Sequence, residues 1–338
     1  MAARTTYQVF VGVDVAAKTF TASWAPPEGE PSPPVTLPQT PAGFLDLQQR
    51  LSSTSVAPAA TLLVVEATGS YWITLTVTLH QAGFVVSVVN PAQVHNYAKS
   101  LPRRAKTDAL DAVLLLQFAL ERQPAPWTPP PAVYHELRQR LVARDALMEM
   151  RQQARNHRHA LAQWPVQIAT VKAQLDAVIA DLDQRIATLE HEIAHVLREQ
   201  AWATSAALLQ SIHSIGPLTT AWMLVSTLNF QACATPTAAV AYAGLAPMLY
   251  ESGSSVRGRP QLGHGGHKRL RTALYLATFN AVRFNPVIKR FYERLCAAGK
   301  PKKVARCAAA RKLLQIAWAV VRTGQPFDAN YAAAQRAA

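Results

Sequence analysis

Four acidic residues in the first third of the chain have types and positions that suit metal chemistry. Asp14 ends an apolar run that begins at Gln8, and Glu66 ends a similar run that begins at Thr61. Asp108 and Asp111 stand three residues apart in a segment with helical periodicity, so they share one helix face. The first 121 residues hold eight acids, and half of them belong to this group.

Clustered carboxylates repel one another unless a cation neutralises them, and hard oxygen ligands select Mg2+, with Mn2+ as a second possibility. Two such ions about 4 Å apart polarise a phosphodiester and stabilise its attacking and leaving oxygens. Any one of these acids alone is more simply a turn or cap residue, and Asp108 beside Thr107 could be an N-cap. The four together, in this order, favour a catalytic metal site.

Two strands and a helix must position these side chains. Residues 8–14 and 61–66 are apolar and β-branched, which predicts strands buried on both faces that carry their last carboxylate to the sheet edge. The helix from Lys106 onward would pack on the sheet through Leu114, Leu115 and Phe118.

Residues 5 to about 122 alternate between strand and helix patterns, which predicts an α/β domain. Strands are expected near residues 7–14, 18–25, 61–66 and 84–89. Helices are expected near residues 41–52, 70–82 and 107–121. Residues 36–41 hold two prolines and are expected to form a loop.

The rest of the chain is predicted to be mainly helical. Residues 123–131 are rich in proline and predict a stiff linker. Residues 132–202 predict two long helices split around Trp164–Pro165, with the apolar spacing of a coiled coil or of ordinary helix packing. The predicted domains are therefore 1–122, the linker 123–131, a helical arm 132–202 and a mainly α domain 203–338.

Charge points to a polyanionic partner. The 338-residue chain has a net charge of +14, and the segment 257–312 alone holds fifteen Lys or Arg against Glu293. The basic residues expected to contact nucleic acid are Arg257, Arg259, Lys268, Arg269, Arg271, Lys300, Lys302 and Lys303. A second basic cluster, residues 151–159, is equally compatible with a phosphate contact or a solvated helix face.

Two further segments could contact nucleic acid. Residues 208–224 resemble a helix-hairpin-helix turned at Gly216, although a plain helical turn explains them as well. Residues 242–271 form a glycine-rich segment that contains Ser252, Ser254 and Ser255 among arginines, which suits either a phosphate-binding loop or a serine nucleophile.

These motifs, in this order, resemble the DEDD transposases of bacterial insertion sequence family one-ten. The resemblance rests on the four acids and, further along, on Gly244-Leu-Ala-Pro, Glu251-Ser-Gly-Ser and Leu270-Arg-Thr-Ala-Leu-Tyr. It covers nearly the whole chain. It implies an RNase H-like (RuvC-like) N-terminal domain, a C-terminal transposase module, and recombination of donor and target DNA guided by an element-encoded bridge RNA.

Carried over by position, Asp14, Glu66, Asp108 and Asp111 match the metal ligands of the family, and Ser252 matches its nucleophile. Ser254 and Ser255 stand close enough to be alternatives. Many relatives have a Lys-Arg-Gly turn after the loop that contains Ser252, which we call the serine loop. This chain has His264-Gly-Gly-His267-Lys-Arg at that place. The phosphate contacts there are therefore open.

The resemblance implies a Mg2+-dependent attack by Ser252 that leaves a covalent 5′-phosphoserine link, in a homo-oligomer that assembles from dimers to a tetramer. The alternative enzyme is a Holliday-junction or RNase H-like nuclease that uses water, and the non-enzymatic alternative is a basic binding protein with a degenerate nuclease fold. Three cysteines without metal-ligand spacing, no signal pattern and no long apolar run predict a soluble, cytoplasmic, nucleoid-associated protein without membrane contact.

Overall fold

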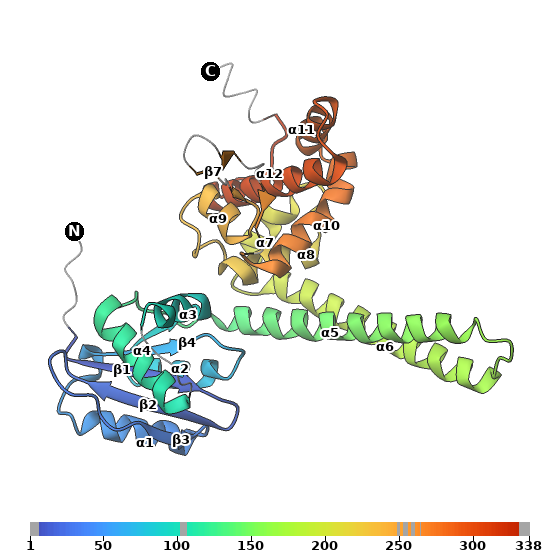
Figure 1. The fold of residues 1–338 in the computed structure, drawn as a ribbon. Coiled ribbons are helices and arrows are strands. Elements are labelled where there is room, and N and C mark those ends of the chain that lie inside the picture. Colours follow the sequence, from blue (N-terminus) through green and yellow to red (C-terminus); the bar gives the residue numbers. More distant parts are fainter. Residues whose placement is uncertain are drawn as a thin grey trace. The chain divides into compact units, whose positions relative to one another are not determined.

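The computed structural model describes residues 7–101, 107–248, 251–252, 256–257, 261–263 and 265–330 (Figure 1). The chain divides into two compact units, Met1–Pro129 and Pro130–Ala338. Each unit has its own hydrophobic core. No helix in the described ranges is long and apolar enough to cross a membrane.

The N-terminal unit is built on one five-stranded mixed sheet of order β3-β2-β1-β4-β5. β1 pairs antiparallel with β2 and parallel with β4; β2 and β3 are antiparallel, and β4 and β5 are parallel. The strands are β1 (Val9–Val15), β2 (Thr19–Ala25), β3 (Val35–Pro38), β4 (Thr61–Glu66) and β5 (Val85–Val89). The four predicted strands are thus confirmed. The loop predicted at residues 36–41 was wrong for residues 36–38, which belong to β3, whereas residues 39–40 do connect β3 to α1.

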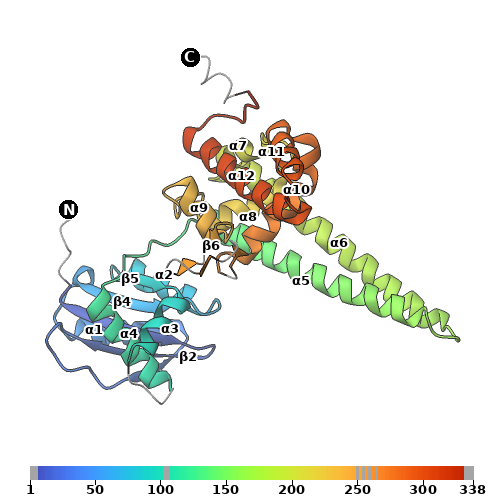
Figure 2. The same cartoon turned by 45° about the horizontal axis from the view of Figure 1, so that its top comes forward.

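Helices cover both faces of this sheet (Figure 2). α1 (Pro41–Ser52) and α2 (Trp72–Gln81) pack on the face that carries Val9, Val11 and Val13. α3 (Pro91–Lys99) and α4 (Asp108–Arg122) pack on the opposite face, which carries Phe10. A 3-10 turn, Pro58–Ala60, precedes β4. Helix α3 was not predicted.

The proline-rich segment is partly attached to the N-terminal unit. The Trp127 N–H donates to the Val86 carbonyl at 2.7 Å, and the Trp127 ring lies edge-on to Trp72 with centroids 5.6 Å apart. The Ser87 hydroxyl donates to the carbonyls of Pro124 and Ala125, each at 2.8 Å. These contacts cover part of the free edge of β5.

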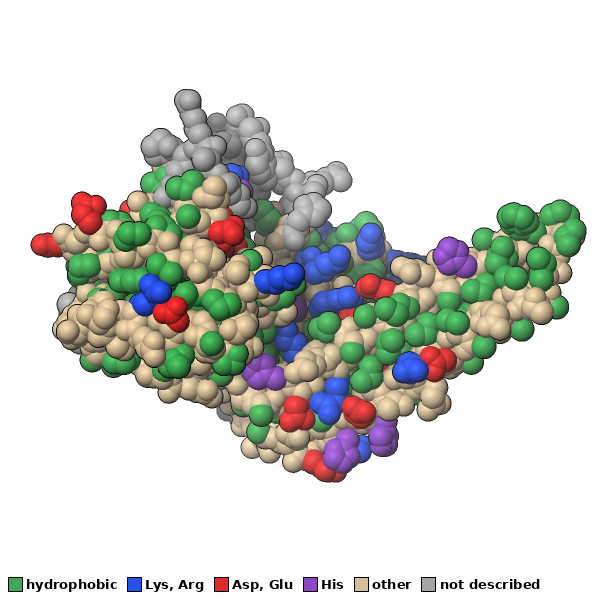
Figure 3. Space-filling view, turned by 90° about the horizontal axis from the view of Figure 1, so that it is seen from below, with side chains coloured by type: hydrophobic (Ala, Val, Ile, Leu, Met, Phe, Trp, Pro, Cys, Tyr) green, Lys and Arg blue, Asp and Glu red, His purple; other side chains and the backbone are tan. Residues whose placement is uncertain are grey.

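The second unit begins with an antiparallel helical hairpin formed by α5 (Ala132–Leu161) and α6 (Ala169–Glu199). The predicted break between two long helices is confirmed; supercoiling of the pair stays a prediction. The hairpin buries one stripe of α6, made of Ile179, Leu182, Ile186, Ile193 and Val196. At its far end, hydrophobic side chains gather on the surface, among them Trp164, Val166 and Ile168 (Figure 3).

Ion pairs join the two helices of the hairpin. Arg144 binds Glu190 at 2.6 Å and Arg140 binds Glu192 at 2.8 Å. The predicted basic cluster on α5 is paired in the same way: Arg151 and Arg155 bind Asp183, and Arg158 binds Asp176 at 2.6 Å. These arginines therefore have acidic partners within the hairpin.

The remainder of the second unit is mainly helical and shares one core with the base of the hairpin. Its helices are α7 (Ala203–Gln210), α8 (Pro217–Thr227), α9 (Pro236–Tyr242), α10 (Lys268–Phe284), α11 (Pro286–Ala297) and α12 (Lys302–Thr323). Two short antiparallel pairs lie between α9 and α10. They are β6 (Pro247–Met248) with β9 (Gln261–Leu262), and β7 (Glu251–Ser252) with β8 (Val256–Arg257).

Candidate functional site

Asp14 and Glu66 lie at the carboxyl ends of two neighbouring parallel strands, as the next-to-last residue of β1 and the last residue of β4. Val13 of β1 lies opposite Val65 of β4, so the next residues, Asp14 and Glu66, reach the same edge of the sheet. Successive side chains of a strand point to opposite faces. Asp14 therefore shares a face with Phe10, and Glu66 shares it with Leu62 and Val64, which belong to the core beneath α3 and α4.

At Gly12, the backbone of α4 lies very close to the backbone of β1 on this face of the sheet. A Cβ at Gly12 would collide with backbone atoms of Ala112, Leu115 and Leu116, so only glycine allows the helix to lie this close to β1. The contact fixes the first turns of α4 beside the carboxyl end of β1.

Helix α4 starts just before the contact with Gly12. Thr107 is its N-cap, because the Thr107 hydroxyl accepts from the Leu110 N–H at 3.3 Å. The alternative in which Asp108 is the N-cap is therefore wrong. Asp108 and Asp111 lie in the first turn, where the helix N-terminus favours negative charge.

The four carboxylates act on one another electrostatically. Burial, and then the charges of Asp111, Asp108 and Glu66 in that order of strength, together raise the pKa of Asp14 from 3.8 to about 6. The backbone N–H of Val15 opposes this rise. All four predicted acids are thus within electrostatic reach of one position.

The donor set suits a hard divalent cation, because it offers carboxylate oxygens whose mutual repulsion the cation would relieve. Within the described residues, however, no three Asp, Glu, His or Cys side chains converge closely enough to hold one ion. Glu66 has a local partner, since the Thr68 hydroxyl donates to its Oε1 at 2.8 Å. Shared coordination would require these side chains to turn toward one another.

A cavity of about 420 Å³ adjoins two of the acids. Glu66 and Asp111 line it together with His95 and Lys99 of α3. The prediction from sequence missed these two basic residues because it missed α3. The available signal was Asn90-Pro91, an N-cap followed by proline at N1; the Asn90 side chain does accept from the Ala92 N–H at 2.9 Å.

The serine loop is described in part. Ser252 of β7 pairs with Val256 of β8, and Glu251 pairs with Arg257. Ser254, Ser255 and Arg259 lie outside the described residues, as do the side chains of Ser252 and Arg257. The roles predicted for these five residues remain predictions.

The base of the serine loop, residues 242–244 and 265–271, is closely packed. The His267 N–H donates to the Tyr242 carbonyl at 2.8 Å, and the two rings stack with centroids 5.9 Å apart. Arg271 donates to the Gly265 carbonyl at 2.7 Å. Gly244 has φ +69°, and a Cβ there would collide with Arg271 and Gly265, so the loop base requires glycine.

His267 also starts helix α10. Its Nδ1 accepts from the Leu270 N–H at 3.2 Å. Burial, and then the charge of Arg138, lower the pKa of His267, so the ring is neutral at neutral pH and can accept this hydrogen bond. Several residues that the sequence assigned to phosphate contacts therefore surround a structural turn.

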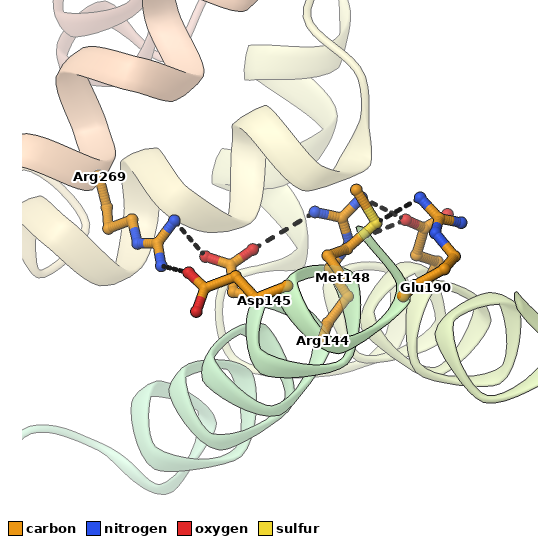
Figure 4. Close-up of polar contacts among 7 residues, drawn as sticks. Arg144, Asp145, Met148, Glu190 and Arg269 are labelled. Atoms are coloured by element: carbon orange, nitrogen blue, oxygen red, sulfur yellow. Dashed lines mark hydrogen bonds and ion pairs between the residues drawn. The ribbon is translucent and has the colours of Figure 1, made fainter. Parts of the chain in front are cut away.

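The predicted nucleic-acid contacts differ in their surroundings. Arg269 binds Asp145 at 3.1 Å and Glu149 at 3.4 Å, both on α5, and Arg144 binds Asp145 from the other side (Figure 4). A phosphate would have to compete with these acids. Four predicted contacts are exposed and form no ion pair within the described part of the chain; they are Lys268, Lys300, Lys302 and Lys303.

Comparison with known proteins agrees with this organisation. A transposase family model of the DEDD, IS110 type matches residues 11–163, and a model described as transposase IS116/IS110/IS902 family matches residues 206–293. The first match includes all four acids, and the second includes the serine loop.

Similar proteins span the whole chain. The pilin gene-inverting proteins of Moraxella bovis and Moraxella lacunata are each 31% identical over 327 residues, which is 95% of this chain and 98% of theirs. An uncharacterised 43.6 kDa protein of insertion element IS110 from Streptomyces coelicolor is 29% identical over 123 residues, or 36% of this chain and 30% of that protein. The chain therefore belongs to the IS110 family of transposases and site-specific recombinases, enzymes that cut and rejoin DNA.

Proposed function

We propose that this protein recombines donor and target DNA through a divalent-metal site in its N-terminal unit and a serine nucleophile in its second unit. Asp14, Glu66, Asp108 and Asp111 would hold Mg2+, and Ser252 would attack the DNA. The observation that best supports the metal site is the position of Asp14 and Glu66 at adjacent strand ends beside the first turn of α4. The raised pKa of Asp14, to which the other three acids all contribute, agrees with this arrangement.

The sheet supports an RNase H-like assignment for the N-terminal unit. An antiparallel β1-β2-β3 meander is extended by two parallel strands, and helices cover both faces. The acids lie at one edge of this sheet, where α4 meets the ends of β1 and β4. Open sheets that contain parallel strands bind ligands outside the carboxyl ends of those strands, where these acids lie.

Bound Mg2+ would polarise the scissile phosphodiester and stabilise its developing charge. The four carboxylates would orient the phosphate. The Ser252 Oγ forms a bond to phosphorus while the bond from phosphorus to the 3′ oxygen breaks, and the serine proton ends on that oxygen. The 3′-hydroxyl of another strand then attacks the 5′-phosphoserine, which re-forms a phosphodiester and regenerates the serine.

Partners follow from the same proposal. Donor and target DNA are the substrates, an element-encoded bridge RNA selects them, and a dimer that assembles to a tetramer supplies the sites. Asp14 and Ser252 belong to different compact units, so one subunit could supply the acids and another the serine. Activity recovered on mixing Asp14→Ala and Ser252→Ala chains would support sharing; inactivity of every mixture would contradict it.

The central experiment traps the covalent intermediate. The protein is incubated with Mg2+, RNA transcribed from the noncoding end of the element, and labelled element-end DNA, then denatured and separated by electrophoresis. A labelled protein band should form with the native protein and with the Ser254→Ala and Ser255→Ala controls, and disappear with Ser252→Ala. Cleavage without any labelled protein band would indicate a nuclease that uses water.

A further inference from the structure

The cavity beside Glu66 and Asp111 has a basic side that the proposed chemistry has not used. His95 and Lys99 lie four residues apart on α3, so they occupy the same helix face, and both line the cavity with the two acids. The cavity volume of about 420 Å³ is in the range that small ligands occupy.

Both basic side chains are available to a ligand. His95 and Lys99 are exposed, and neither forms an ion pair or side-chain hydrogen bond anywhere in the described chain. Lys99 remains unpaired even though two carboxylates line the same cavity. Other exposed cations of this protein do pair, such as Arg50 with Asp46 at 2.7 Å.

The rest of the cavity lining is mainly apolar. Val94 and Leu114, which are buried, line it together with the acids and bases. Oxygen ligands for a cation and hydrogen-bond donors for an anion thus line the same cavity. A phosphodiester needs this combination, because a metal neutralises part of its charge and donors bind the oxygens that the metal does not contact.

We propose that His95 and Lys99 form a phosphate-binding subsite that positions the DNA strand against the carboxylates. The proposal rests on the function proposed above and adds two positioning residues to it. Lys99 would bind a backbone phosphate as a point charge, and His95 would donate a hydrogen bond from its imidazole N–H. The ligand is the DNA backbone, so the subsite carries no base specificity.

Chemical protection of Lys99 tests the binding step without any need for cleavage. The Ser252→Ala protein is acetylated with a lysine-selective reagent, with or without single-stranded DNA, and each lysine is followed by peptide mass spectrometry. DNA at about ten times its dissociation constant should slow acetylation of Lys99 about tenfold. Lys172, which is exposed on α6, is the reference lysine. Unchanged acetylation of Lys99, or protection by RNA of the same sequence but not by DNA, would overturn the proposal.

Kinetics test the positioning role. Lys99→Ala should raise KM for DNA cleavage about tenfold, the loss of one hydrogen bond to a charged group, and change kcat less. Lys99→Arg should restore most of the loss. Arg50→Ala removes the same charge from α1 on the opposite face of the sheet and should leave KM unchanged. Equal effects of Lys99→Ala and Arg50→Ala would reduce the result to net charge and overturn the proposal.

The two proposals can fail separately. If Asp14→Ala still cleaves DNA, the metal site is wrong, whereas acetylation of Lys99 still reports whether DNA occupies the cavity. If Asp14→Ala is inactive and Lys99 is not protected, the metal site stands and the phosphate subsite falls.

Discussion

Asp14 carries the electrostatic cost of the acidic cluster. Its carboxyl group is half-buried at the end of β1, and three further acids act on it, so ionisation is less favourable in the folded protein than in the unfolded chain. A bound divalent cation would instead favour the ionised form of Asp14. The same residue therefore reports on folding when metal is removed and on binding when metal is added.

Replacing Asp14 with Asn should stabilise the metal-free protein at neutral pH. The folded pKa of about 6 exceeds the ordinary value of 3.8, so the penalty is absent at low pH, grows as pH rises between these values, and is complete above about 6. After allowance for solvent screening of a half-exposed group, we expect about 1 kcal/mol, or about 2–4 °C in Tm. Thermal unfolding in a chelator measures it.

Two comparisons make this prediction specific. Asp46→Asn, which removes an ion-paired acid on α1, should not stabilise the protein. Adding Mg2+ should raise Tm of the native chain and leave Asp14→Asn nearly unchanged. An Asp14→Asn protein that gains no more stability at neutral pH than near pH 4 would contradict the electrostatic account.

At the residue scale, the sequence indicated the acids but not their basic neighbours. Asp14 and Glu66 lie at the ends of strands with clear apolar, β-branched runs, and Asp108 and Asp111 lie in the first turn of a periodic helix. His95 and Lys99 lie on a nine-residue helix that buries only Val94 and Tyr97, so its apolar signal was too weak to detect. The ion pairs could not be predicted either, because the sequence does not show that Arg269 contacts Asp145, which is more than 120 positions earlier.

At the scale of elements, close contacts between backbone segments hold the four acids and the serine loop in place. Gly12 lets α4 approach β1, and Gly244 with Gly266 lets the loop base close beside Arg271. The hydrogen bond from Arg271 to the Gly265 carbonyl is then a structural contact at the end of the serine loop. This differs from the phosphate contact that the sequence suggested.

Arg271→Ala should therefore affect catalysis more than DNA binding. Loss of the hydrogen bond to Gly265 loosens the loop that carries Ser252, so we expect kcat to fall about tenfold while KM changes little. Arg283→Ala, an exposed arginine on the same helix, is the matched control for charge. If Arg271→Ala instead raises KM and spares kcat, Arg271 is a phosphate contact, as first predicted. Single-turnover cleavage separates the two.

The sequence of β3 explains why this strand was not predicted. β3 has four residues and only Leu37 buried, and Pro38 resembles a loop residue although it ends an edge strand, where a missing N–H is tolerated. The hairpin was easier, because thirty-residue helices repeat their apolar spacing many times. One atypical residue changes the apolar pattern of a long helix little, whereas it obscures the pattern of a four-residue strand.

At the scale of the whole molecule, the net charge of +14 is concentrated in residues 257–312. The basic cluster on α5 is compensated by acids of α6, whereas Lys300, Lys302 and Lys303 are exposed and have no acidic partner in the described chain. Nonspecific nucleic-acid affinity should depend on the uncompensated group.

Salt titration distinguishes these groups. The triple change of Lys300, Lys302 and Lys303 to Ala should reduce the slope of log affinity against log salt by up to about 2.7, because each phosphate contact contributes about 0.9. The triple change of Arg151, Arg155 and Arg158 to Ala removes the same charge and should alter the slope less. Fluorescence anisotropy with duplex DNA measures both; a larger effect of the arginines would place the polyanion on the hairpin.

The attachment of Trp127 to β5 has a mechanical consequence. Only Thr128 and three prolines separate this anchored residue from the start of α5 at Ala132. Four residues of extended polyproline span about 12 Å and resist bending. The proline-rich segment 123–131 therefore leaves at most four residues, three of them proline, in which the backbone can bend before α5 begins.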